Sequence, residues 1–197
     1  MNEPNEPSIW QIDGGDLIET VGGGWDAFAK ENDASDLAGK SVVGRSLFDF
    51  IAGDEVRRVH QHLLRSVRRF RTPLAVPFRC DSPDLRRHMR LEMRPAGGGA
   101  VEFRAVLLRA ERQPHLRLLD AAEPRSYAFV VSCSFCHKIR EKDEGGEWME
   151  VDTAADRLGL LVLQRPPRLV HGVCPSCKAT LGRLRDRDVD EDPDTPA

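Results

Sequence analysis

The sequence predicts an α+β fold in which helices cover one antiparallel sheet and a small cysteine-rich unit follows. Two observations lead to this prediction. Two strand-like segments, several short helices, one long helix and three more strand-like segments follow one another within residues 8–110. Strands and helices segregated in this way are typical of a single sheet with helices packed on it. Two C-x-x-C pairs then lie within residues 129–185.

The segment from residue 8 to residue 51 supplies two strands and the short helices. SIWQID and LIETV are strand-like and flank the turn signal Gly14-Gly15-Asp16. WDAFAKEN places Trp25, Phe28 and Ala29 at the spacing of one helix face, which predicts a short helix. SLFDFI is expected to form a helical turn with Ser46 as its N-cap.

The longest helix is predicted over DEVRRVHQHLLRSVRRF, with Asp54 as N-cap and Pro73 beyond its end. Its apolar residues follow the helical period, and its arginines fall largely on the other faces. LAVPFRC, RHMRLEMRP and AVEFRAVLLRA then read as strands. Gly97-Gly98-Gly99 joins the last two strands as a hairpin.

The charge balance argues against a globally basic nucleic-acid binder. The 197 residues contain 29 Lys and Arg against 32 Asp and Glu, a formal net charge of −3. One arginine-rich stretch, at positions 57–71, carries no acidic residue and could contact phosphates. A solvated helix face is the commoner role of such a stretch, so nucleic-acid binding is not expected. Residues 186–197 contain six acidic residues and are expected to be a disordered acidic tail.

The cellular location of the protein is predicted from the absence of a membrane-helix pattern and of a secretory signal in the sequence. No stretch approaches the roughly 18–20 apolar residues of a membrane helix, and the N-terminal MNEPNEPS has no features of a secretory signal. These observations predict a cytoplasmic protein that does not contact membranes. Thiols stay reduced in that compartment, so the cysteines need an explanation other than disulfides.

Four of the five cysteines are expected to bind one zinc ion: Cys133, Cys136, Cys174 and Cys177. Each C-x-x-C turn presents two thiolates, and two such turns supply a tetrahedral site. Zinc is the default metal for four thiolates. The 37 residues between the pairs, 137–173, are no objection, because loop closure grows only slowly with length. Within them EWMEV is expected to be a strand and DTAADRLGLL a helix capped by Asp152 or Thr153.

Other interpretations of the cysteine unit stay open. His171 could replace one cysteine or hydrogen-bond to a thiolate, and His137 could lie near the metal without binding it. A C-x-x-C pair can also be a thiol switch. Cys133 to His137 further matches the C-x-x-C-H pattern of covalent haem attachment, which normally belongs to exported chains and would leave the second pair unexplained.

The segments WDAFAKEN and GKSVVGRSLFDFI, followed by the long helix and the three-strand meander, resemble a PAS domain. This resemblance covers residues 8–110 and implies a sensory or dimerisation module whose sheet can hold a small ligand, a flavin, a haem or nothing. CSFCHKIR, GEWMEVD and HGVCPSC resemble the cysteine module that follows PAS or receiver domains in some bacterial signalling proteins. His137 stands where that module usually has lysine. The second resemblance implies a signalling or adaptor role.

Three histidines and the fifth cysteine are further candidates for functional residues. His60, His62 and His88 could supply an axial ligand to a haem, but they are expected to be surface residues. Cys80 lies in a strand-like run, unlike the flavin-reactive cysteine of light-sensing PAS domains, and is expected to be a small buried hydrophobe. The sequence has no P-loop, G-x-S-x-G or H-E-x-x-H motif, so no enzymatic activity is expected.

These observations predict a regulatory module with three parts. A PAS-like domain over residues 8–110 senses a ligand or mediates dimerisation, residues 111–128 form a linker, and residues 129–185 form the zinc unit. The expected partner is a signalling protein acting in trans, with a possible homodimer through the PAS-like domain. The alternatives are a zinc-containing DNA-binding regulator and a haem or redox sensor.

Overall fold

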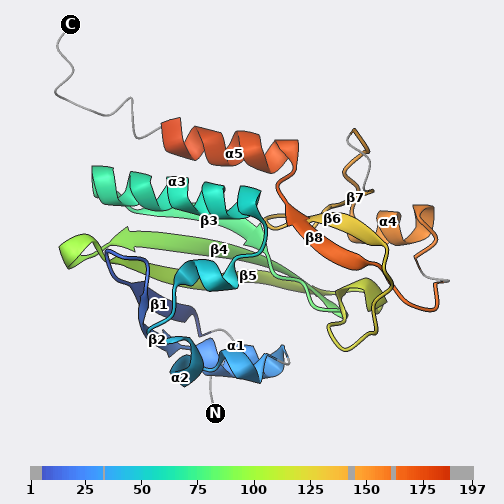
Figure 1. The fold of residues 1–197 in the computed structure, drawn as a ribbon, viewed down its shortest axis with the longest axis horizontal. Helices are drawn as coiled ribbons and strands as arrows, with labels where there is room; N and C mark the ends of the chain where they lie inside the picture. The colour runs from blue at the N-terminus through green and yellow to red at the C-terminus, as the bar shows by residue number, and fades with distance from the viewer. Residues whose placement is uncertain (1–5, 33, 142–144, 161–162, 187–197) are drawn as a thin grey trace, which may run out of the picture. The chain divides into compact units, whose positions relative to one another are not determined.

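A computed structural model describes residues 6–32, 34–141, 145–160 and 163–186 of the chain (Figure 1). The chain divides into two compact units. The first comprises Met1–Val76, Arg90–Val106 and Pro175–Ala197, and the second comprises Pro77–Met89 and Leu107–Cys174. Most of the predicted acidic tail, residues 187–197, lies outside the described residues. Among the helices described, none is long and apolar enough to cross a membrane.

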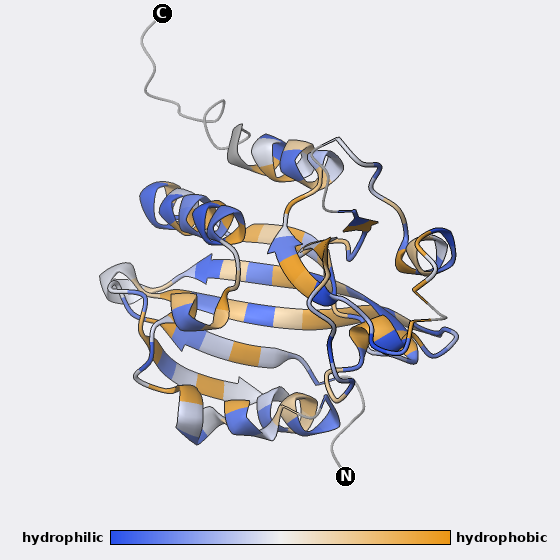
Figure 2. Cartoon of the chain, turned by 45° about the vertical axis from the view of Figure 1, so that its right-hand side comes forward, coloured by the Kyte–Doolittle hydropathy of each residue, from blue (hydrophilic) through white to orange (hydrophobic). Residues whose placement is uncertain are grey.

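A five-stranded antiparallel sheet confirms the predicted α+β class. Its strands are β1 (Ser8–Ile12), β2 (Ile18–Gly23), β3 (Leu74–Arg79), β4 (Leu85–Pro95) and β5 (Val101–Arg112), in the order β2-β1-β5-β4-β3. The N-terminal strand β1 therefore pairs on one side with β2 and on the other with β5. Hydrophobic and hydrophilic bands alternate along these strands, as expected for a sheet with one covered face (Figure 2).

Aromatic side chains fill the first unit beside β1. Trp10 is paired with Phe103 of β5, and their rings stack with centroids 5.0 Å apart and an interplanar angle of 4°. The edge of the Trp25 ring contacts Trp10 at a centroid distance of 5.4 Å. Such pairs contribute about 0.5–1.5 kcal/mol beyond the area they bury. They hold the first helix against the sheet.

The predicted short helices are present between β2 and the long helix. They are α1 (Trp25–Glu31), α2 (Gly39–Val42) and two 3-10 turns at Ser35–Leu37 and Leu47–Phe50. Ser46 caps the second turn as predicted, because its hydroxyl accepts a hydrogen bond from the Phe48 amide at 3.2 Å. This agreement shows that the cap could be recognised from local chemistry alone.

The long helix α3 spans Asp54–Phe70, and its N-cap is Gly53 instead of the predicted Asp54. Gly53 has a φ of 87°, which a glycine adopts without steric cost. Asp54 becomes the first helical residue, where its charge is favourable to the helix dipole. The helix ends at Phe70, as predicted, and Arg71 follows in the left-handed conformation before Pro73.

Arg68 ties α3 to two hairpins of the first unit. Its guanidinium donates to the carbonyls of Gly99 at 2.8 Å and Asp13 at 2.9 Å. It also forms an ion pair of 2.8 Å with Asp16. This arginine therefore fixes the C-terminal half of α3 against the β1–β2 and β4–β5 turns.

The second unit has its own small sheet and hydrophobic core. The strands β6 (Phe129–Cys133), β7 (Ile139–Arg140) and β8 (Arg168–Gly172) lie in the order β7-β6-β8. The buried core comprises Leu116, Leu118, Val130, Ile139, Val151, Ala154, Ala155 and Leu160. Part of the segment expected to be a linker, a 3-10 turn at Arg117–Leu119, therefore lies within this unit.

Two local predictions in the second unit are wrong. EWMEV is not a strand, because only Met149 pairs, bridging Ile139. The helix α4 spans Val151–Arg157 with Glu150 as N-cap, not Asp152 or Thr153. Val151 is fully buried, so packing starts the helix one residue before the polar cap candidates. The helix also ends earlier than predicted, at Arg157, because residues 158–160 form a turn; Leu161 lies outside the described residues.

The last helix, α5 (Pro175–Asp186), was not predicted from the sequence. It packs alongside α3 in the first unit (Figure 1). An ion pair of 2.5 Å joins Lys178 of α5 to Glu55 of α3. The signal that could have found it is Pro175, since proline is favoured at the first position of a helix.

Candidate metal centre

The first pair of cysteines lies on a tight turn between β6 and β7. Cys133 ends β6, and its carbonyl accepts the His137 amide at 2.9 Å while its amide donates to the Lys138 carbonyl at 2.8 Å. His137 closes the turn with a φ of 58°, in the left-handed region. These bonds bend the chain so that Cys136 faces the same side as Cys133.

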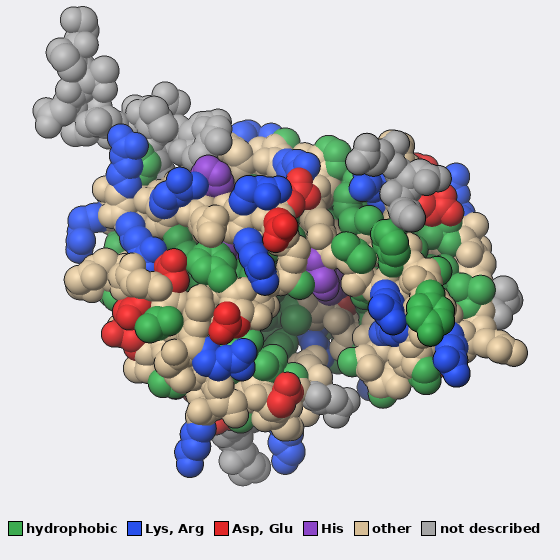
Figure 3. Space-filling view, viewed as in Figure 1, with side chains coloured by type: hydrophobic (Ala, Val, Ile, Leu, Met, Phe, Trp, Pro, Cys, Tyr) green, Lys and Arg blue, Asp and Glu red, His purple; other side chains and the backbone are tan. Residues whose placement is uncertain are grey.

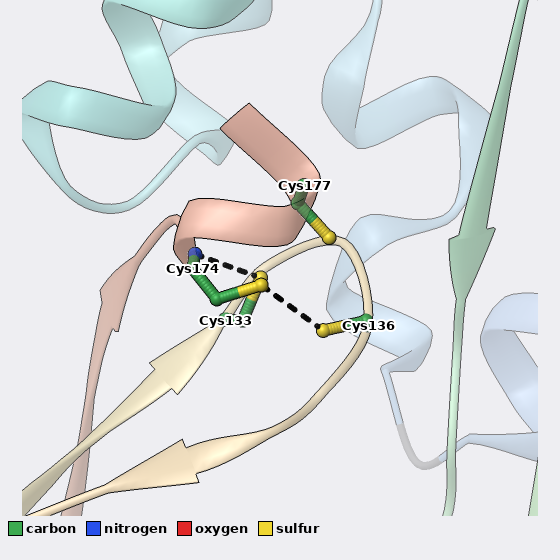
Figure 4. A group of neighbouring side chains, drawn as sticks. All are labelled: Cys133, Cys136, Cys174 and Cys177. Carbon is green, nitrogen blue, oxygen red and sulfur yellow. Dashed lines mark hydrogen bonds between the residues drawn. The ribbon is translucent and has the colours of Figure 1, made fainter. Parts of the chain in front are cut away.

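The second pair lies where β8 passes into α5. Cys174 comes just before Pro175, and Cys177 belongs to the first turn of the helix. The Cys174 amide donates a hydrogen bond of 3.4 Å to the Cys133 sulfur (Figure 4). This bond links the second C-x-x-C turn to the first.

The register of the small sheet brings the two pairs together. β6 and β8 are parallel, and Cys133 lies opposite Gly172. The Ser134 amide donates to the Gly172 carbonyl at 3.0 Å, which extends the pairing beyond the strands. Because parallel strands end at the same edge of a sheet, the two C-x-x-C turns meet there.

The four sulfurs have the spacing that a single tetrahedral metal ion needs. All four lie within 4.8 Å of one another, and the sulfurs of Cys136 and Cys174 are 3.6 Å apart (Figure 4). Zinc–sulfur bonds of about 2.3 Å in a tetrahedron place the sulfurs about 3.8 Å apart. Cys133 and Cys174 are buried, and Cys136 and Cys177 are half-buried. The cluster could therefore hold a metal ion such as zinc.

The two histidines near the cluster do not belong to the group of potential ligands among the described residues. His137 is held beside a buried carboxylate, with its Nδ1 3.6 Å from Asp81. Burial lowers the pKa of His137, and the charge of Asp81 opposes this effect. The His171 Nδ1 lies 3.4 Å from the Ser134 hydroxyl, and desolvation lowers its pKa.

A buried ion-pair group that was not predicted from the sequence lies in the second unit beside the first turn. Asp81, whose side chain is completely buried, binds the guanidinium of Arg79, whose Nη1 also pairs with Glu150 at 2.7 Å. The Arg79 amide donates to the Phe135 carbonyl, between Cys133 and Cys136, at 2.8 Å. Burial alone would lower the pKa of Arg79, but its hydrogen bond to Asp81 and the charge of Asp81 raise it overall.

The first unit contains an apolar pocket of about 220 Å³. Its lining is Trp10, Ile18, Trp25, Leu37, Val42, Leu47, Phe50, Ile51, His60, Leu91 and Phe103. The indole N–H of Trp10 is buried and has no hydrogen-bond partner among the described residues. Pockets with such an apolar lining are typical of binding sites for small molecules.

The remaining candidates are not among the potential metal ligands that the described residues bring together. His60 is partly buried in the pocket wall and not on the surface as expected; its Nδ1 lies 2.9 Å from the Val56 carbonyl. His62 is exposed, and His88 lies 3.6 Å from Glu111. Cys80 follows β3, and burial raises the pKa of its thiol.

No protein-family model matches this chain, and no curated protein matches it at a significant level. The fold and the site therefore define its class: an α+β protein with a five-stranded antiparallel sheet and a cluster of four cysteines that could bind a metal ion.

Proposed function

We propose that this chain is a non-enzymatic regulatory module that combines a structural zinc ion with a PAS-like sensory domain. The observation that carries the proposal is the group of four cysteine sulfurs within 4.8 Å of one another. Four thiolates close the coordination shell of zinc and leave no open position for a substrate. The role of the ion is therefore to stabilise the fold.

The chain's own residues prepare the zinc site. The β6–β8 register aligns the two turns, and the Cys174 amide, just before α5, donates to the Cys133 sulfur. Arg79 holds the backbone of the first turn through Phe135. Such a site does not exist in the unfolded chain, so the free energy of metal binding becomes free energy of folding, roughly 10–16 kcal/mol in zinc-finger peptides.

The sensory role rests on the order of elements and on the pocket. The residues 8–110 resemble a PAS domain, and the pocket is lined almost entirely by apolar and aromatic side chains. The ligand class is a small planar apolar molecule whose acceptor atom binds the Trp10 indole N–H.

The output is a contact with a partner protein in trans. Several apolar side chains of the second unit are exposed: Tyr127, Phe129, Leu163 and Val170. Exposed apolar groups of this kind mark protein interaction sites when they gather on one surface. Val170 lies on β8, at an edge of the three-stranded sheet, where a partner can approach.

Chelation tests the zinc half of the proposal. We expect that a strong zinc chelator lowers the midpoint of thermal unfolding of the full chain, and that added zinc restores it. Magnesium serves as the control, since a site of four thiolates does not select it. An unchanged midpoint after complete metal removal would contradict a stabilising metal.

Calorimetric titration with quinoline and naphthalene tests the sensory half. The two probes have similar shapes, but only quinoline carries an acceptor nitrogen, so we expect quinoline to bind more tightly through Trp10. Leu91→Trp, which fills the pocket, should abolish binding, whereas Leu108→Trp on the exposed part of β5 should not. Equal binding to both variants would place the ligand elsewhere.

A further inference from the structure

Three arginines of α3 form one exposed row: Arg58, Arg65 and Arg69. At about 100° per residue their positions fall within about 40° of one another around the helix. Figure 3 shows lysine and arginine side chains gathered where α3 lies in Figure 1. We call these three residues the arginine row.

Carboxylates neutralise the neighbouring arginines of α3 but not the arginine row. Arg57 pairs with Asp54 at 3.8 Å, and Arg68 pairs with Asp16 at 2.8 Å. Within the part of the chain that the structure describes, no such ion pair reaches the arginine row. Like charges four residues apart, such as Arg65 and Arg69, destabilise a helix. Negative charges placed beside the arginine row would therefore stabilise this face of α3.

The helix α5 delivers the C-terminal segment to the side of α3. The two helices run side by side in the same direction, joined near their first turns by Lys178 and Glu55 (Figure 1). From Lys178 to the last helical residue, Asp186, α5 rises about 12 Å at 1.5 Å per residue. The same rise along α3 from Glu55 ends near residue 63. The chain therefore leaves α5 level with the middle of the arginine row.

The segment that follows has the charge and the length to cover the arginine row. Residues 187–197, RDVDEDPDTPA, contain five acidic residues and one arginine. Eleven extended residues reach at most about 37 Å, whereas the whole of α3 is about 26 Å long. Its carboxylates can therefore reach every member of the row.

We propose that the acidic segment 187–197 binds the arginine row of the same chain and covers it against other polyanions. The covalent link gives the segment an effective concentration in the millimolar range, so that weak ion pairs suffice. Because the contact is electrostatic and exposed, it weakens as the ionic strength rises.

Heparin binding by the full chain tests this proposal with a defined polyanion. In one variant the five tail acids are neutralised: D188N, D190N, E191Q, D192N and D194N. The matched control neutralises five exposed carboxylates elsewhere: E6Q, E31Q, D36N, E141Q and D156N. We expect the tail variant to bind heparin about tenfold more tightly than the control at low salt, and to lose this advantage in high salt. Adding R58Q, R65Q and R69Q should remove the difference.

Nuclear magnetic resonance of the arginine side chains detects the contact directly. The Nε–Hε resonances of the arginine row should shift when the tail is neutralised, by the same amount at every protein concentration. Equal heparin affinity of the tail variant and the control would overturn the proposal. A shift that depends on protein concentration would assign the contact to a second copy of the chain. Equally tight binding of duplex DNA by the unmodified chain and the tail variant would show that the row is open to nucleic acid.

Discussion

At the scale of single residues, the Asp81 carboxylate is the most deeply buried group among the ion pairs of the described residues. Its side chain is fully buried and accepts hydrogen bonds from the Arg79 side chain and from the Arg87 amide at 3.0 Å. Removing one partner of a buried ion pair is strongly destabilising, because the other charge stays buried without compensation. Asp81 therefore supports the fold around the first C-x-x-C turn through Arg79.

Replacing Asp81 by asparagine is expected to lower the free energy of unfolding by about 3 kcal/mol, because Arg79 then keeps a buried charge without its main partner. Glu150→Gln is the matched control, since Glu150 pairs with the same arginine but is 39% exposed. That change should cost less than about 1 kcal/mol. Urea unfolding at neutral pH measures both, and equal costs would contradict the role given to Asp81.

His60 is expected to make the stability of the first unit depend on pH. Burial lowers the pKa of His60 below its usual 6.5, while its bond to the Val56 carbonyl opposes this. The unfolded chain then binds the proton more readily, so the contribution of His60 is complete above about pH 6.5 and is lost as the pH falls.

Thermal unfolding near pH 7.5 and pH 5.5 checks this dependence. His60→Gln should lose less stability on acidification than the unmodified chain. His62→Gln, on the exposed face of the same helix, should lose as much as the unmodified chain. An equal loss in His60→Gln and the unmodified chain would show that this histidine does not titrate on unfolding.

At the scale of elements, local chemistry predicts strands and caps better than it predicts long-range pairing. The alternation of Met89, Leu91 and Met93 predicted β4, and the Ser46 cap was found from residue type and position. The parallel pairing of β6 with β8 places Phe129 opposite Arg168, 39 residues further along the chain. No local sequence pattern predicts this pairing. Tertiary packing also overrode the capping signal at Asp152.

The last two residues of β2, Gly22 and Gly23, allow a matched test of how strongly the backbone requires glycine. Gly23 has a φ of 60°, and a Cβ there would lie 2.2 Å from the Pro7 carbonyl oxygen. Gly22 would meet nothing within 4 Å. We expect Gly23→Ala to lower the free energy of unfolding by about 1–3 kcal/mol, and Gly22→Ala to leave it nearly unchanged. Equal urea midpoints for the two variants would contradict this strain.

At the scale of the whole molecule, the cysteine cluster is the feature that sequence and structure indicate most consistently. The spacing of the two C-x-x-C pairs predicted a common site, and the β6–β8 register brings all four sulfurs together. The pocket and the Asp81 group were not predicted, because both assemble side chains from distant segments. His60 shows this well: two arginines, Arg57 and Arg58, precede it closely in the sequence, but its side chain lines an apolar pocket.

The decisive measurement of the zinc site is the metal content of the purified full chain, determined by inductively coupled plasma mass spectrometry. We expect one zinc ion per chain. The ion should be lost when Cys133, Cys136, Cys174 or Cys177 is changed to serine, and kept when Cys80, which lies outside the cluster, is changed in the same way. A metal-free chain purified without chelator, or zinc retained after Cys133→Ser and Cys174→Ser, would contradict a zinc site at this cluster.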